Sequence, residues 1–188
     1  MVKIILMGRC CRISFDIVNI NLKTETSLFE WVWTNTLNEI NTIIQKLINK
    51  EPILIHRVDG NDYMKDTNIV TCHYINKDYN EIVIRRSRRF MNDIINNEDI
   101  LFIRDDCLGT INHEEIRHFY SLIKTINPLL RFKLLLLSDG GKFNEIIYPN
   151  LHHKIYDKSL YIKYINDCYV IEDNVKNTNV GDISDDEC

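Results

Sequence analysis

Long hydrophobic runs are missing from this 188-residue sequence. No segment reaches the roughly 18 uncharged apolar residues that a membrane span requires, and the longest apolar runs, at residues 3–7 and 134–137, have the length of strands. The apolar stretch near the N-terminus is too short for a signal peptide, and no small-x-small cleavage site follows it. We therefore expect no membrane segment and an intracellular, cytoplasmic protein whose six cysteines are thiols rather than disulfides.

An excess of basic residues is also missing. The formal net charge is −4 and the pI is about 5.9, whereas nucleic-acid-binding domains usually carry a basic excess. We therefore expect no nucleic-acid partner, and a protein or a small molecule as the substrate. Alanine is absent altogether, while isoleucine and asparagine occur 30 and 21 times. This bias is typical of A+T-rich coding sequence and indicates a genome such as that of a large DNA virus, which would place the protein in the host cytoplasm or the virion.

The spacings that mark metal and phosphate sites are missing too. Cys10, Cys11, Cys72 and His73 are residue types that bind zinc, but no CxxC or HxxxH pair occurs, and zinc sites usually show such a pair. The Gly140–Gly141 pair lacks the GxGxxG or Walker spacing of a phosphate loop and is interpreted as a turn. We expect neither a bound metal nor a cofactor.

Apolar runs rich in Ile and Leu alternate with segments of helical periodicity. Strands are predicted at residues 2–7, 53–58, 68–75, 99–104, 132–137, 154–156 and 169–171, with a polar turn at 59–62. Helices are predicted at residues 11–20, 35–49, 78–97, 114–126 and 159–166. This alternation predicts one α/β domain over residues 1–172, with a mostly parallel sheet that helices cover on both faces. Residues 173–188 are polar and acidic and are predicted to form a disordered tail.

Polar residues follow three of the predicted strands, at residues 8–11, 104–106 and 138–141. In parallel α/β sheets, ligands sit beyond the carboxyl ends of the strands. We therefore expect these three strand ends to converge on one crevice. His152 and His153, by contrast, are expected in a loop.

Cys11 lies where the first strand ends and a helix begins. A thiol at this point faces backbone N–H groups and the positive end of the helix dipole, which both favour the nucleophilic thiolate. Gly8 would let the backbone turn sharply and leave room for a substrate. A nucleophilic Cys needs a base, and His73 on a predicted strand is the natural one. The alternative is that Cys10 and Cys11 are small buried residues and that His73 is an ordinary edge-strand histidine.

Residues 28–33 form a dense aromatic segment. Glu30 lies inside it, and a carboxylate that is buried there must find a partner such as histidine or arginine. We interpret Trp31 and Trp33 as core residues. Thr34 is the candidate N-cap of the helix that follows.

Residues 85–89 contain four arginines. On a helix, Arg85 and Arg89 share a face, as do Arg86 and Arg89. Such a pair can bind a carboxylate or a phosphate. The alternative, which we favour for Arg85 and Arg88, is a solvated face that balances the acidic excess of the chain.

Taken in order, these residues resemble the DUF1796 family of papain-like cysteine peptidases. The matching pieces run over roughly residues 3–140 and are Gly8-x-x-Cys11, Leu28-Phe29-Glu30-Trp31, a strand with His73, Arg85-Arg86-x-x-Arg89-Phe90 and Leu101-Phe102-Ile103-Arg104. Two positions depart from the family pattern, because Glu30 stands where the family has Asp and Leu28 where it has Pro.

The resemblance implies a thiol-dependent hydrolase that acts on an acyl or isopeptide bond, and it offers a papain-like α+β fold as the alternative to the parallel sheet. Cys11 would be the nucleophile, His73 the base, and Glu30 the acid that orients His73. Residues in contact with the substrate would be Gly8, Arg12, Trp31, Arg86, Arg89 and Arg104, with backbone N–H groups near Arg12 as the oxyanion hole.

Two other functions stay open. In the first, the chain is a non-catalytic module that holds an anionic ligand, such as a nucleotide or a sugar phosphate, at the strand ends. In the second, it binds a partner protein through the acidic tail.

Overall fold

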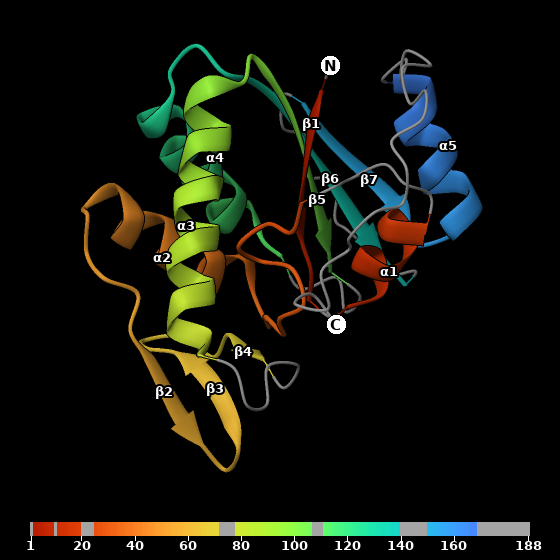
Figure 1. Ribbon diagram of the computed structural model, residues 1–188. Helices are drawn as coiled ribbons and strands as arrows, with labels where there is room; N and C mark the ends of the chain where they lie inside the picture. The colour runs from red at the N-terminus through yellow and green to blue at the C-terminus, as the bar shows by residue number, and fades with distance from the viewer. Residues whose placement is uncertain are drawn as a thin grey trace, which may run out of the picture.

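The main sheet has four parallel strands. The computed structural model describes residues 2–9, 11–19, 25–71, 78–106, 111–139 and 150–168. Within these residues the strands β1 (Lys3–Met7), β5 (Asp99–Asp105), β6 (Arg131–Ser138) and β7 (Leu151–Ile155) lie in the order β1-β5-β6-β7, and each neighbouring pair is parallel. The expected α/β class with a mostly parallel sheet is therefore confirmed (Figure 1).

Helices cover both faces of this sheet (Figure 1). The helices α1 (Arg12–Asn19) and α5 (Lys158–Cys168) lie on one face, and α2 (Leu37–Ile48), α3 (Tyr79–Asn96) and α4 (His113–Ile126) lie on the other. Side chains alternate between the two faces along each strand. In β5, for example, Phe102 packs in the core below α2–α4, whereas Ile103 packs in the core with α1 and α5.

A small antiparallel sheet lies beside the N-terminal end of α3 (Figure 1). It contains β2 (Ile55–Val58), β3 (Asn61–Met64) and β4 (Val70–Thr71) in that order. Asp59 and Gly60 join β2 to β3 and both have positive φ angles, 48° and 82°, as a two-residue hairpin turn requires. The expected turn over residues 59–62 was therefore two residues too long, because the second half belongs to β3.

Several local predictions were wrong. Thr34 is not an N-cap, because Thr36 caps α2 and forms a capping box with Glu39. His152 and His153 lie on β7 rather than in a loop. Trp33 is 57% exposed rather than in the core, since it forms an isolated bridge with Val70 of β4 at the surface.

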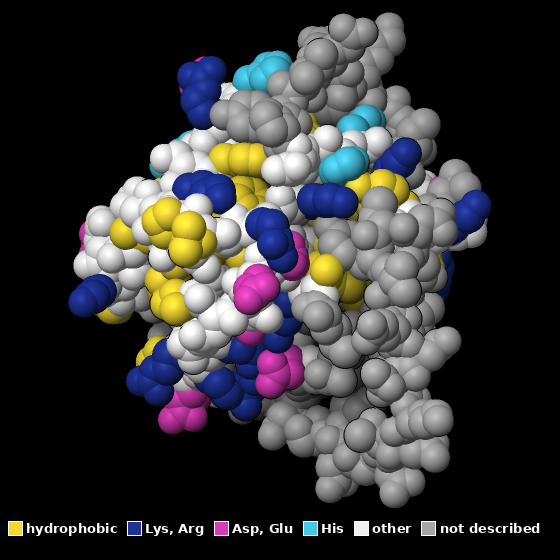
Figure 2. Space-filling view, turned by 90° about the horizontal axis from the view of Figure 1, so that it is seen from above, with side chains coloured by type: hydrophobic (Ala, Val, Ile, Leu, Met, Phe, Trp, Pro, Cys, Tyr) yellow, Lys and Arg dark blue, Asp and Glu magenta, His cyan; other side chains and the backbone are white. Residues whose placement is uncertain are grey.

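Other predictions fall outside the described residues, namely the Gly140–Gly141 turn, the strand at 169–171 and the tail at 173–188. In the part of the chain that the structure describes, no helix is both long and apolar enough to cross a membrane. The view from above shows basic and acidic side chains interspersed with small apolar patches (Figure 2).

Candidate functional site

The carboxyl ends of β1, β5 and β6 converge, as expected. Arg12, the first residue of α1, donates from Nε and Nη2 to the two carboxylate oxygens of Asp105, at 2.6 and 2.7 Å. Its Nη1 donates to Asp139, directly after β6, at 2.7 Å. The guanidinium also lies 3.7 Å from the ring centre of Tyr156, which follows β7. Burial by itself lowers the pKa of Arg12, but the bonds with Asp105 and Asp139 outweigh burial and raise it, so Arg12 stays charged.

Cys11 directly precedes α1. Its carbonyl accepts the first helical hydrogen bond, from the N–H of Phe15 at 3.0 Å, and its side chain is half-buried. The first turn of α1 contains no acidic residue, so no carboxylate on that turn neutralises the positive helix end. Cys10, Cys72 and His73 lie outside the described residues.

Glu30 is buried next to the end of β1. It is 1% exposed, and its Oε1 accepts a hydrogen bond from the N–H of Ser27 at 2.5 Å. The loop that carries it is bonded to β1 at two points, because the Ser27 hydroxyl donates to the Leu6 carbonyl and the Gly8 N–H donates to the Phe29 carbonyl. The acid is therefore held beside the turn that leads to Cys11.

Trp31 has a strained backbone. Its φ is 60°, a left-handed conformation that a bulky residue rarely adopts. Its ring meets the ring of Phe15 edge to face, with centres 4.8 Å apart, and Phe15 is 54% exposed. The Trp31 carbonyl accepts a hydrogen bond from the hydroxyl of Thr71 at 3.1 Å. Because Thr71 precedes His73 by two residues, Trp31 links α1 to the strand that leads to the candidate base.

Arg104 is completely buried under the Gly8 turn. Its Nη1 donates to the carbonyls of Met7 and Gly8, at 3.4 and 3.2 Å, and to the hydroxyl of Thr34, which in turn donates to the Gly8 carbonyl at 2.9 Å. Burial lowers the pKa of Arg104 to about 10, although Asp106 and Asp105 oppose the shift. The expected ligand-binding guanidinium thus supports the main chain of the turn, and Thr34 completes that support.

Arg86 and Arg89 hold the loop of Glu30 against α3. Arg86 is 1% exposed and donates to the Glu30 carbonyl at 3.2 Å. Arg89 donates to the Thr26 carbonyl at 2.8 Å and lies 3.8 Å from Glu25. Both side chains therefore position the segment that carries the candidate acid.

Sequence reasoning missed a Ser–His pair at the same edge of the sheet. Ser138 Oγ at the end of β6 and His153 Nε2 on β7 form a hydrogen bond of 2.9 Å, and Ser138 is completely buried. Burial lowers the pKa of His153, Lys154 lowers it further, and Asp106 opposes the shift. The pair depends on the register between β6 and β7, which pairs Leu136 with His153, and a short strand that contains two histidines and a lysine has no apolar run to predict that register.

A second missed cluster surrounds Asp16 on α1. Its carboxylate accepts hydrogen bonds from the hydroxyls of Tyr156 and Tyr161, at 2.6 and 2.7 Å, and lies 3.0 Å from the Lys158 ammonium. A possible signal was present in the sequence, since Asp16 interrupts the apolar stripe of Ile13 and Ile17. A carboxylate on such a stripe needs polar partners.

No group of three or more His, Cys, Asp or Glu side chains that could hold a metal occurs among the described residues. Comparison with models of known families, with curated proteins and with solved structures gave no match to this chain. The resemblance to the DUF1796 family therefore stays a prediction from the sequence motifs.

Proposed function

We propose that the chain is a thiol-dependent hydrolase of the papain-like cysteine peptidase type, in which Cys11 attacks the carbonyl carbon of an acyl or isopeptide bond. The observation that carries the proposal is the position of Cys11 at the first hydrogen bond of α1, four residues after the end of β1. The N–H groups of a first helical turn stabilise a thiolate and can also hold the oxyanion of a tetrahedral intermediate.

The other roles follow from the chemistry of a Cys–His pair. His73 takes the thiol proton, and Cys11 Sγ forms a bond to the carbonyl carbon. His73 then gives the proton to the leaving amine or alcohol, and water cleaves the resulting thioester to regenerate the thiol. Glu30 orients the imidazole. Support comes from the burial of Glu30 beside the Gly8 turn and from the bond of Thr71 to the Trp31 carbonyl.

Phe15 and Trp31 provide an aromatic surface for the substrate. Phe15 lies one helical turn after Cys11, remains half-exposed and contacts the Trp31 ring. Backbone strain of the kind found at Trp31 is concentrated at functional sites. Gly8 and the main chain near Arg12 complete the surroundings of the thiol.

The contacts of the arginines favour the hydrolase over a module that binds an anionic ligand at the strand ends. Arg12 donates hydrogen bonds to the carboxylates of Asp105 and Asp139. Arg104 Nη1 donates to the carbonyls of Met7 and Gly8 and to the hydroxyl of Thr34. An anionic ligand would have to displace these bonds, whereas thiol chemistry leaves them in place.

The test is the alkylation rate of each cysteine between pH 5 and 9, measured with iodoacetamide and resolved by peptide mass spectrometry. The other five cysteines of the same chain are the internal controls. We expect Cys11 to react fastest near pH 6, by up to about tenfold for each unit by which its pKa falls below that of an ordinary thiol, because a larger thiolate fraction is partly offset by a weaker nucleophile. His73→Asn should reduce this advantage, and Cys11→Ser should abolish turnover of a thioester or peptide substrate. An alkylation rate of Cys11 equal to that of the other thiols would refute the proposal.

A further inference from the structure

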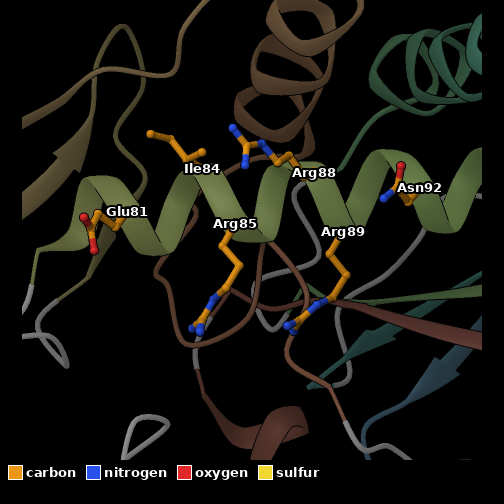
Figure 3. Close-up of a pocket in the computed structure, with 6 residues that line it drawn as sticks. All are labelled: Glu81, Ile84, Arg85, Arg88, Arg89 and Asn92. Carbon is orange, nitrogen blue, oxygen red and sulfur yellow. The ribbon is translucent and has the colours of Figure 1, made fainter.

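An open groove of about 620 Å³ runs along α3. Its lining residues are Glu81, Ile84, Arg85, Arg88, Arg89 and Asn92. The side chains of Arg85 and Arg89 project to one side of the helix, and those of Ile84 and Arg88 project to the other (Figure 3).

The positive charge in this groove is poorly balanced. Arg85 and Arg88 are exposed, and neither forms an ion pair with a described residue. Arg89 is half-buried and bound to the Thr26 carbonyl, near Glu25. Like charges one helical turn apart, such as Arg85 and Arg89, repel each other. The groove is therefore suited to an anionic partner that supplies more than one carboxylate.

Such a segment exists in the same chain. Residues 172–188 contain six acidic residues and one lysine. This segment carries a net charge of −5, so the rest of the chain has a net charge of +1. The overall acidity of the protein is thus concentrated in a stretch that follows α5, whereas α3 carries two exposed arginines, Arg85 and Arg88, that form no ion pair with a described residue.

We propose that the arginine face of α3, formed by Arg85, Arg88 and Arg89, is a docking surface whose occupant is the acidic segment at residues 182–187. This segment reads Asp-Ile-Ser-Asp-Asp-Glu. Its carboxylates bind the exposed guanidinium groups of Arg85 and Arg88, since arginine matches a carboxylate with two parallel hydrogen bonds. Ile84 is 49% exposed beside them and offers an apolar contact to Ile183.

The dimensions are compatible. Three to four residues of helix advance by about 5–6 Å, which equals the length of about two residues of extended chain. Carboxylates at 185–187 therefore match the spacing of Arg85 and Arg88 along the helix axis, and the segment would cross α3 to meet both side chains, which project to opposite sides of the helix (Figure 3). The 14 residues from the end of α5 at Cys168 to Asp182 can span up to about 46 Å. A domain of this length has a radius of gyration of about 16 Å, so the segment can reach the face of the sheet that carries α3.

The test uses the full chain, labelled with ¹⁵N, and follows the amide resonances of residues 182–187. A synthetic peptide of this segment gives the resonance positions of the undocked state. In 50 mM NaCl we expect the amides of the native chain to be displaced from those positions. The displacement should fall by at least about twofold in Arg85→Glu/Arg88→Glu and in 500 mM NaCl, where exposed ion pairs are screened.

The matched control is Arg117→Glu/Lys163→Glu, which makes the same charge change at exposed positions on α4 and α5. It should leave the tail resonances displaced, and unchanged dispersion of the other resonances would show that both variants are folded. Native tail amides that coincide with those of the peptide, or that respond equally to both double variants, would overturn the proposal. Binding of a polyphosphate or nucleic acid in the groove with an undocked tail would overturn it as well.

Discussion

Arg12 and Asp105 lie 93 positions apart in the sequence and bind each other through two parallel hydrogen bonds, of 2.6 and 2.7 Å. Asp105 is completely buried, whereas the Arg12 side chain is 24% exposed. Because Arg12 directly follows Cys11, this pair fixes the start of α1 to the end of β5. The placement of the candidate thiol therefore depends on an interaction between two distant segments of the chain.

Replacing one member of this pair should be costly. Asp105→Asn removes the buried carboxylate of the pair and leaves the Arg12 guanidinium with Asp139 as its one charged partner among the described residues, and we expect the free energy of unfolding to fall by about 3 kcal/mol. The control is Asp99→Asn, because Asp99 binds Arg131 with the same two-bond geometry at the surface. The decrease in the free energy of unfolding should be much smaller for Asp99→Asn than for Asp105→Asn. Equal losses in urea denaturation of both variants would contradict the role of burial.

Thr34→Val should weaken the support of the Gly8 turn. The substitution removes the hydroxyl that donates to the Gly8 carbonyl and accepts from Arg104. Both partners are buried, so we expect a loss of about 1–3 kcal/mol in the free energy of unfolding. Thr125→Val is the control, since the Thr125 hydroxyl is exposed and bonds only its own helix. A loss as small as that of Thr125→Val would show that Arg104 finds another acceptor.

The left-handed backbone at Trp31 predicts an unusual order of stability. Trp31→Gly and Trp31→Ala both remove the ring contact with Phe15, but only glycine relieves the strain of a φ of 60°. We therefore expect Trp31→Gly to be about 1 kcal/mol more stable than Trp31→Ala. At Trp33, whose φ is not positive, alanine should be the more stable replacement. Thermal unfolding of the four variants measures both differences, and the same order at both positions would refute the prediction.

Acidification should destabilise the protein through β7. Burial lowers the pKa of both His152 and His153 in the folded state. The unfolded chain therefore binds protons first as the pH falls below the ordinary histidine pKa of about 6.5, and the free energy of unfolding decreases from pH 7 toward pH 5. His153→Asn should make this decrease shallower, because one of the two contributing imidazoles is gone.

The matching measurement is the NMR titration of the His153 ring in the folded and the urea-unfolded chain. We expect the midpoint of the folded protein to lie at the lower pH. A midpoint at or above that of the unfolded chain would mean that the negative charge of Asp106 outweighs burial.

The parallel sheet was predictable because its strands are continuous apolar runs. Residues 99–104 and 132–137 have the pattern of strands that are buried on both faces, and the structure extends each by only one or two residues. The meeting of the strand ends was also predictable, since parallel strands place their carboxyl ends at one edge. The contacts of Arg12 with Asp105 and Asp139 confirm that prediction.

The roles of the arginines were not predictable in the same way. A guanidinium at the end of a strand has the same sequence signature whether it faces a ligand or a backbone carbonyl. Arg104 is completely buried because the loop around Thr34 covers it, and that loop is fixed by tertiary contacts. Likewise β3 was not predicted, because its residues 61–64 are mostly polar. This segment is a strand because it pairs with β2, and the pairing cannot be read from its composition.

The pairing of β1 with β5 has a consequence for synthesis of the chain. Lys3 lies opposite Ile100, and Met7 lies opposite Arg104. The ribosome therefore releases the apolar strand β1 almost 100 residues before the strand that it pairs with. Because synthesis proceeds at about 5–20 residues per second, β1 stays unpaired for roughly 5–20 s. During this time Ile5 and Leu6, which are completely buried in the final structure, have no sheet to join, so the yield of soluble protein should depend on chaperones that bind the nascent chain.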